Sequence, residues 1–186
     1  MSQSNKILVM VFPGESPADA EIRIERDLVS ISNLRPRWNE IKDMSHDSVE
    51  FIEGLRDFFG DFQSVWELSS PKTIACIGIE DCLAIFELAS AWKHLVWPIH
   101  LLELYNNLPD QVQIFRGGAG SVEDVLSGHS WTLDIGFAQV FATNSNGIVV
   151  SAMVTRDGIL LLGDIELEVI PRRASLHGAH EILDVG

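Results

Sequence analysis

Three short groups of polar residues in the second half of the chain have side chains that could bind a phosphate and act on a sugar. Arg116 follows an apolar run and precedes a glycine-rich stretch. A guanidinium in that position can present its planar fork to a phosphate while the backbone approaches a ligand closely. Ser130 and Thr132 flank Trp131, and in an extended strand their hydroxyls would share one face, where they could orient a carboxylate and a ribose.

Two carboxylates form the third group. Glu166 and Glu168 are two residues apart in the last strand that we expect, so both would lie on one face, roughly 7 Å apart. Two carboxylates at one cleft can divide the work, one holding a substrate and the other acting on a sugar. Taken singly, each group also fits an ordinary solvated arginine, a Ser/Thr strand with a buried tryptophan, or the polar face of a half-exposed strand.

Apolar periodicity predicts the elements that position these residues. Helical spacing before residue 110 predicts helices over 48–59, 80–96 and 99–107. The first of these would begin with a capping box made by Asp47 and Glu50. Residues 6–12 are expected to form a buried strand, whereas 19–31 fit a strand or a helix equally well. We interpret the tryptophans of the apolar helices (Trp66, Trp92 and Trp97) as core residues.

Beyond Pro109 the chain changes to short apolar or alternating runs separated by Gly, Asn and Asp, which is typical of strands and turns. Strands are expected at 112–115, 148–154, 159–162 and 166–170, with a helix over 134–142. We therefore expect an α+β protein. In it, residues 1–110 are mainly helical and part of the same domain, residues 111–172 form a β-rich core, and 173–186 form a partly mobile tail.

The composition argues against several classes of protein. The chain has 186 residues, about one domain, with an ordinary globular balance of 46% hydrophobic and 22% charged residues. Thirteen basic and twenty-seven acidic residues give a net charge of −14, which opposes non-specific binding to nucleic acid. No run approaches the ~18 apolar residues of a membrane span, and no convincing signal peptide is present. We expect a cytoplasmic protein without a membrane partner.

Other site types lack their usual sequence patterns. The glycines after Arg116 match neither GxGxxG nor GxxxxGK[ST], and no Gly-x-Ser-x-Gly elbow occurs. Cys76 and Cys82 have no second pair, which argues against a zinc site or a disulfide framework. His177 and His180 lie in a glycine-containing tail, so we expect them in solvent and predict no metal site.

Taken together, three runs resemble the ADP-ribosyltransferase superfamily. The runs are Ile114-Phe115-Arg116-Gly117, Ser130-Trp131-Thr132-Leu133-Asp134 with Ala138 and Phe141-Ala142, and Glu166-Leu167-Glu168-Val169-Ile170. The resemblance covers roughly residues 112–171 and is to the arginine–serine–glutamate class, in the compact form common in bacterial and phage proteins. It implies a split, mainly antiparallel β-core and transfer of ADP-ribose from NAD, which is consumed as a substrate.

The resemblance also implies roles for individual residues. Arg116 would bind an NAD phosphate, and the Gly117 backbone would hydrogen-bond the nicotinamide amide. Glu168 would be the catalytic glutamate, steadied by Ser130, while Glu166 would engage the incoming nucleophile. The implied NAD-binding residues are Arg116, Gly117, Ser130, Thr132 and Phe141, and the implied catalytic residues are Glu168, Glu166 and Ser130. A carboxylate near the ribose would stabilise the oxocarbenium-like cation that forms when nicotinamide departs.

The acidity of the chain favours a protein over a nucleic acid as the ADP-ribose acceptor, as in a toxin or an effector. Two alternatives remain open. One is an NAD glycohydrolase, in which water is the acceptor. The other is a non-catalytic acidic binding module that keeps the fold and mimics a polyanion. The chain departs from the family pattern at Trp131 and Thr132, which replace the last two residues of Ser-Thr-Ser. The loop that would select the acceptor, residues 160–166, is small.

Overall fold

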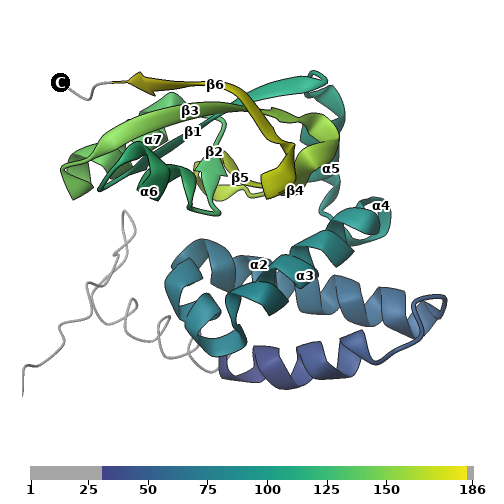
Figure 1. The fold of residues 1–186 in the computed structure, drawn as a ribbon. Helices are drawn as coiled ribbons and strands as arrows, with labels where there is room; N and C mark the ends of the chain where they lie inside the picture. Colours follow the sequence, from purple (N-terminus) through teal and green to yellow (C-terminus); the bar gives the residue numbers. More distant parts are fainter. Residues whose placement is uncertain (1–30, 184–186) are drawn as a thin grey trace, which may run out of the picture.

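The computed structural model describes residues 31–183, which form a helical part followed by a β-rich part (Figure 1). The strand predicted at 6–12 lies outside the described residues, as does the ambiguous segment 19–31 except for its last residue. The first described helix ends at residue 42. Among the described residues, none of the helices combines the length and the apolar character that crossing a membrane requires.

The central helix of the first part is α2, Val49–Ile77. Its N-cap is Ser48, whose hydroxyl accepts a hydrogen bond of 3.0 Å from the Phe51 N–H, so the predicted cap at Asp47 is wrong by one residue. The helix also continues well beyond residue 59, because its buried face is extended by further aromatic and aliphatic residues. The buried side chains along it include Phe51, Leu55, Phe58, Phe59, Phe62, Val65 and Trp66.

Three shorter helices follow: α3 (Ile79–Ala91), α4 (Lys93–Val96) and α5 (Ile99–Asn107). Gly78, with φ of 97°, lets the chain turn between α2 and α3 in a conformation that residues with a Cβ rarely adopt. The helix predicted over 80–96 is interrupted at Trp92, which ends α3. The predicted bounds of α5 are confirmed.

Within the described residues, the strands form one six-stranded sheet in the order β4-β5-β2-β1-β3-β6, and each neighbouring pair is antiparallel. The strands are β1 Gln111–Gly118, β2 Trp131–Thr132, β3 Ile148–Thr155, β4 Ile159–Leu162, β5 Glu168–Pro171 and β6 Leu176–Leu183. The antiparallel α+β architecture is therefore confirmed. The prediction of a partly mobile tail over 173–186 is wrong for residues 176–183, because they form β6, which pairs with β3 at the edge of the sheet.

The sheet consists of two three-stranded halves. β1 pairs with β3 along its whole length, from Gln111↔Thr155 to Gly118↔Ile148. β1 meets β2 through a single pair, Phe115↔Thr132. The halves β6-β3-β1 and β2-β5-β4 are thus joined at one narrow seam.

Short helices connect the strands. Helix α6 (Val122–Leu126) lies between β1 and β2, and α7 (Ile135–Ser145), capped by Asp134, lies between β2 and β3. Single 3₁₀ turns precede β4, β5 and β6: η1 Arg156–Gly158, η2 Ile165–Leu167 and η3 Arg173–Ser175. The strand predicted over 166–170 is therefore shorter than expected, because its first two residues belong to η2.

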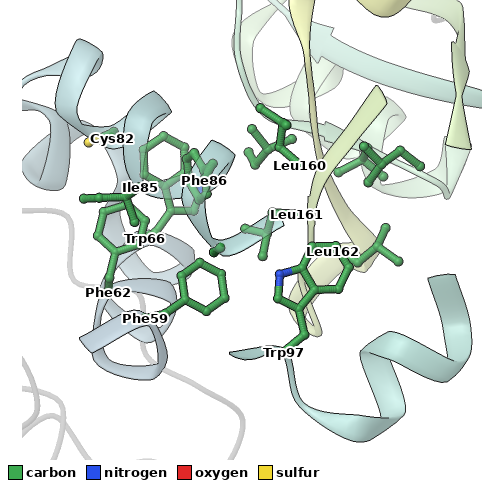
Figure 2. Packing of buried hydrophobic residues seen from close by; sticks show 14 of the residues in the cluster. Phe59, Phe62, Trp66, Cys82, Ile85, Phe86, Trp97, Leu160, Leu161 and Leu162 are labelled. Atoms are coloured by element: carbon green, nitrogen blue, oxygen red, sulfur yellow. The ribbon is translucent and has the colours of Figure 1, made fainter. Parts of the chain in front are cut away.

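One hydrophobic core joins the helical part to the sheet. Every residue of β4 is buried, and its leucines belong to the same cluster as the aromatic residues of α2 and α3. Figure 2 shows Leu160 and Leu161 beside Phe86, with Phe59 nearby. The helices thereby cover the side of the sheet that carries β4 and β5 (Figure 1).

Candidate active site

The residues that the sequence identifies as a possible site all line one pocket of about 300 Å³. They are Arg116, Gly117, Ser130, Thr132, Phe141, Glu166 and Glu168. The strands β1, β2 and β5 supply most of them, Ser130 directly precedes β2, and α7 and η2 supply the other two. Helix α2 forms the remaining wall with Trp66, Glu67, Ser70 and Pro71. The volume is at the lower end of the range of roughly 300–1,000 Å³ for small-molecule sites.

Glu168 is the most deeply buried acidic side chain of the pocket, with 8% of its surface exposed. It begins β5 and pairs with Thr132 of β2. Its Oε1 accepts hydrogen bonds from the Ser130 hydroxyl and from Nε1 of Trp66, the latter 3.1 Å long. Its Oε2 is buried without a hydrogen-bond partner in the described part of the chain.

This environment brings the pKa of Glu168 close to neutral pH. Burial raises the pKa of Glu168 to about 7, because the carboxylate form loses solvation. The hydrogen bonds from Ser130 and Trp66 lower this pKa, while the carboxylates of Glu67 and Glu166 raise it. A carboxyl group in such surroundings can exist in either protonation state near neutral pH, as residues that act on substrates often do.

Arg116 lies on β1, opposite Val150 of β3, with its guanidinium largely enclosed by the pocket wall. Its Nη1 donates a hydrogen bond to the backbone carbonyl of Ser130, and its Nε is buried without a partner among residues 31–183. Burial lowers the pKa of Arg116, and the Glu168 carboxylate raises it. Gly128 lies directly against the guanidinium, because a Cβ at this position would overlap the guanidinium carbon.

Gly117 allows β1 and α7 to touch. A Cβ at residue 117 would collide with the carbonyl oxygen of Ala138 and come within 2.7 Å of the amide nitrogen of Ala142. Only a residue without a side chain fits between the strand and the helix. This close approach brings Phe141, which is also on α7, to the edge of the pocket.

Glu166 reaches the pocket from a turn and not from a strand. It lies in η2 with φ of 63°, and Leu167 follows with φ of 49°. β4 and β5 are antiparallel neighbours, so the chain must reverse between them, and two left-handed residues complete the reversal. The prediction that Glu166 and Glu168 share one strand face is therefore wrong, and the spacing derived from it does not apply.

The turn is held to β2 by Thr132. Its hydroxyl donates a hydrogen bond of 2.5 Å to the carbonyl oxygen of Glu166 and accepts one of 3.0 Å from the Asp134 N–H. Thr132 thus fixes the backbone of Glu166, while Ser130 binds the side chain of Glu168. The strand expected to carry both hydroxyls is shorter than predicted, because β2 begins at Trp131 and Ser130 precedes it. Burial raises the pKa of Glu166.

Sequence reasoning missed the contribution of α2. Glu67 accepts hydrogen bonds from Gln63 (3.0 Å) and from the Asp164 N–H (3.2 Å), and burial raises the pKa of Glu67. Trp66, which we expected to be a core residue only, donates its N–H to Glu168. A usable signal was present: Gln63 and Glu67 are polar residues four apart on the otherwise apolar face of a helix.

Among the described residues, no group of three His, Cys, Asp or Glu side chains is placed to hold a metal ion. Comparisons of the chain with protein-family models, with curated proteins and with solved structures gave no match. The geometry of the pocket is therefore the basis on which a function can be assigned.

Proposed function

We propose that this protein is an NAD-dependent ADP-ribosyltransferase that modifies a protein acceptor. The observation that carries the proposal is the meeting of Arg116, Ser130 and Glu168 in one pocket, with the serine hydroxyl bonded to the glutamate. The resemblance in sequence assigns NAD binding to the first of these residues and catalysis to the other two. A sheet of two antiparallel halves joined at a seam is also compatible with the split core that the resemblance implies.

The unpartnered polar atoms of the pocket suit such a substrate. Arg116 has a buried Nε without a partner in the described chain, and its guanidinium can grip a phosphate through two parallel N–H groups. Oε2 of Glu168, in the same pocket, is likewise buried without a hydrogen-bond partner among the described residues. In this proposal, Arg116 and the Gly117 backbone hold NAD, with Thr132 and Phe141 lining the site around it.

The reaction exchanges one bond at the ribose C1′ for another. The bond to nicotinamide breaks, and its electron pair leaves with nicotinamide. The bond to the nucleophilic atom of the acceptor forms, and that atom gives up one proton. Glu168, as a carboxylate, stabilises the positive charge that develops on the ribose. Glu166 engages the nucleophile and can accept its proton.

Exposed apolar side chains on the two elements that flank the pocket, α7 and η2, favour a protein acceptor over water. They are Ile135, Phe137, Val140 and Phe141 of α7, and Ile165 and Leu167 of η2, and each is more than a third exposed. Phe141 and Ile165 also line the pocket itself. Exposed apolar side chains beside a pocket are typical of protein-interaction sites, whereas hydrolysis of NAD needs no such surface.

The test is incubation of the full chain with labelled NAD in bacterial lysate, beside Glu168→Gln and the control Glu123→Gln, which changes an exposed carboxylate of α6. We expect label on a discrete lysate protein with the wild type and the control, and none with Glu168→Gln. Release of nicotinamide without label would support the glycohydrolase alternative. Neither label nor nicotinamide from folded protein, with no thermal shift on adding NAD, would support the binding module.

An enzyme of this kind would act in a cytoplasm, where it would meet both NAD and its acceptor. A toxin, an effector or a phage protein that alters host machinery would fit the proposal.

A further inference from the structure

The indole of Trp66 lies where the helical part meets the pocket. It belongs to α2, is 2% exposed, and donates its N–H to Oε1 of Glu168 over 3.1 Å. We propose that Trp66 is a positioning residue for Glu168: together with Ser130 it holds Oε1, and so reserves Oε2 for the substrate. This inference rests on the proposed function, since it assigns a role to the surroundings of the same carboxylate.

Packing against neighbouring aromatic rings holds the indole of Trp66 and so fixes the direction of its N–H group. The Trp66 ring packs edge-on against Phe86 of α3, with centroids 4.9 Å apart and an interplanar angle of 87°. It also packs against Phe62, one turn earlier on α2, with centroids 6.1 Å apart. Figure 2 shows Trp66 beside Phe62 and Phe86 in the buried cluster. An indole has one N–H to donate, and packing on two sides directs it at the carboxyl group.

Two donors from different parts of the fold meet on the same oxygen. Ser130 approaches Oε1 of Glu168 from the residue that precedes β2, and Trp66 approaches it from α2. Oε2 receives no hydrogen bond within the described residues. A carboxyl group bound through one oxygen from two directions is fixed in orientation, and its other oxygen is left, buried, without a hydrogen bond among residues 31–183.

The remaining charged groups around Glu168 have known positions. Glu67 of α2 and Glu166 of η2 line the same pocket and disfavour its ionised form, while Arg116 of β1 is the facing cation. The hydrogen bonds from Ser130 and Trp66 lower the pKa of Glu168, against the effect of burial. Loss of the indole N–H therefore leaves the two carboxylates and the arginine in place and removes one group that favours the ionised form.

The chain offers a matched control in Trp97. This residue is also buried, with 5% exposed, and its ring packs edge-on against Tyr105. Its Nε1, however, has no hydrogen-bond partner among the residues described. Trp66→Phe and Trp97→Phe remove the same N–H and shrink the same ring, but only the first removes a hydrogen bond to Glu168.

The first test follows the titration of Glu168 in the full chain by NMR of ¹³C-carboxyl-labelled glutamate, with Glu168→Gln to assign the signal. We expect the pKa of Glu168 to be higher in Trp66→Phe than in the wild type and unchanged in Trp97→Phe. An equal pKa in Trp66→Phe and the wild type would overturn the inference. Because no NAD is needed, this result does not depend on whether the chain turns NAD over.

The second test measures nicotinamide release across pH in bacterial lysate, which supplies the acceptor. We expect Trp66→Phe to lower kcat about tenfold to a hundredfold, the loss expected for a hydrogen bond to a charged group, with KM for NAD within about twofold. Its acid limb should move to higher pH, so that alkaline buffer recovers part of the rate. Equal losses in Trp66→Phe and Trp97→Phe at every pH would overturn the positioning role. A wild type without turnover would overturn the proposed function instead.

A second variant keeps the inference testable if Trp66→Phe does not fold. Benzothienylalanine has nearly the shape of tryptophan, with sulfur in place of the N–H, and can be placed at residue 66 alone. We expect the same rise in the pKa of Glu168 with the ring packing preserved. An unchanged pKa in this folded variant would overturn the inference.

Discussion

The buried carboxyl group of Glu168 couples folding to pH. Burial raises the pKa of Glu168 from its ordinary value of 4.5 to about 7, so the folded chain holds this proton more tightly than the unfolded chain does. Below pH 4.5 both states are protonated and the group costs nothing. As the pH rises from 4.5 through 7, the unfolded state releases the proton first, and stability is lost.

Replacing Glu168 with Gln should remove this loss. The free energy of unfolding of Glu168→Gln, relative to the wild type, is expected to rise by on the order of 3 kcal/mol between pH 4.5 and pH 8. Urea unfolding at both pH values measures the difference. If the variant and the wild type differ by the same amount at both, burial does not govern this carboxyl group.

A substitution at Gly128 tests whether the position of the Arg116 guanidinium matters for ligand binding. A methyl group at residue 128 would overlap the guanidinium, so Gly128→Ala should displace Arg116. On the proposed function it should raise KM for NAD roughly tenfold, as loss of a charge-assisted contact predicts. The control is Gly60→Ala on α2, where a Cβ would meet no atom within 4 Å. Nicotinamide release measures both variants. An unchanged KM in Gly128→Ala would mean that the arginine does not hold NAD.

At the residue scale, the site residues that could be predicted are those whose immediate sequence neighbours form a recognisable pattern. Arg116, Ser130 and Glu168 stand out because each lies in or beside an apolar strand pattern, and all three reach the pocket. The contact between Trp66 and Glu168 joins residues 102 positions apart, and no pattern near either residue indicates it. Glu166 was placed on a strand because alternation of side chains cannot distinguish a strand from the turn that precedes it.

Among the elements, the η2 turn carries backbone strain beside the pocket. A residue with a Cβ in the left-handed region costs roughly 1–2 kcal/mol, and Leu167 adopts this conformation with its side chain partly exposed. Leu167→Gly should therefore leave the free energy of unfolding unchanged or raise it by up to about 1 kcal/mol. Leu95→Gly, at an exposed position of α4, should lower it by about 1 kcal/mol. Urea titration compares the two, and a similar loss in both would argue against strain at Leu167.

Elements whose ends are determined by nearby residues were predicted accurately, whereas those that depend on distant contacts were not. Helix α5 was predicted to the residue because Pro98 and Pro109 bound it in the sequence. The prediction for α2 stopped at residue 59, although the buried Phe62 and Trp66 continue its apolar face past Gly60. Strand β6 was missed because its structure depends on pairing with β3, which the composition of the C-terminal segment does not reveal.

At the scale of the whole molecule, the common core should make the helical part and the sheet unfold together. Leu161 of β4 is fully buried in the cluster that includes the aromatic residues of α2 and α3. Leu161→Ala should lower the free energy of unfolding by about 2–5 kcal/mol, the range for a large cavity in a packed core. Far-UV circular dichroism and tryptophan fluorescence should report one shared transition. Two separate transitions would contradict a common core.

No sequence pattern assigns a function to the helical part, yet α2 supplies one wall of the pocket. The reason is that a pocket between two structural parts is visible only after they pack. The resemblance covers roughly residues 112–171, so it could identify Arg116 and Glu168 but not helix α2, which forms another wall of their pocket.

The seam between β1 and β2 has a mechanical consequence for the pocket. The two half-sheets meet at the pair Phe115↔Thr132, and the pocket straddles that pair, with Arg116 on one side and Glu168 on the other. A joint of one residue pair resists twisting far less than the eight-residue ladder between β1 and β3. A ligand that binds both Arg116 and Glu168 should therefore restrict the motion of one half-sheet relative to the other. Slower amide hydrogen exchange at Phe115 and Thr132 on ligand binding would show this.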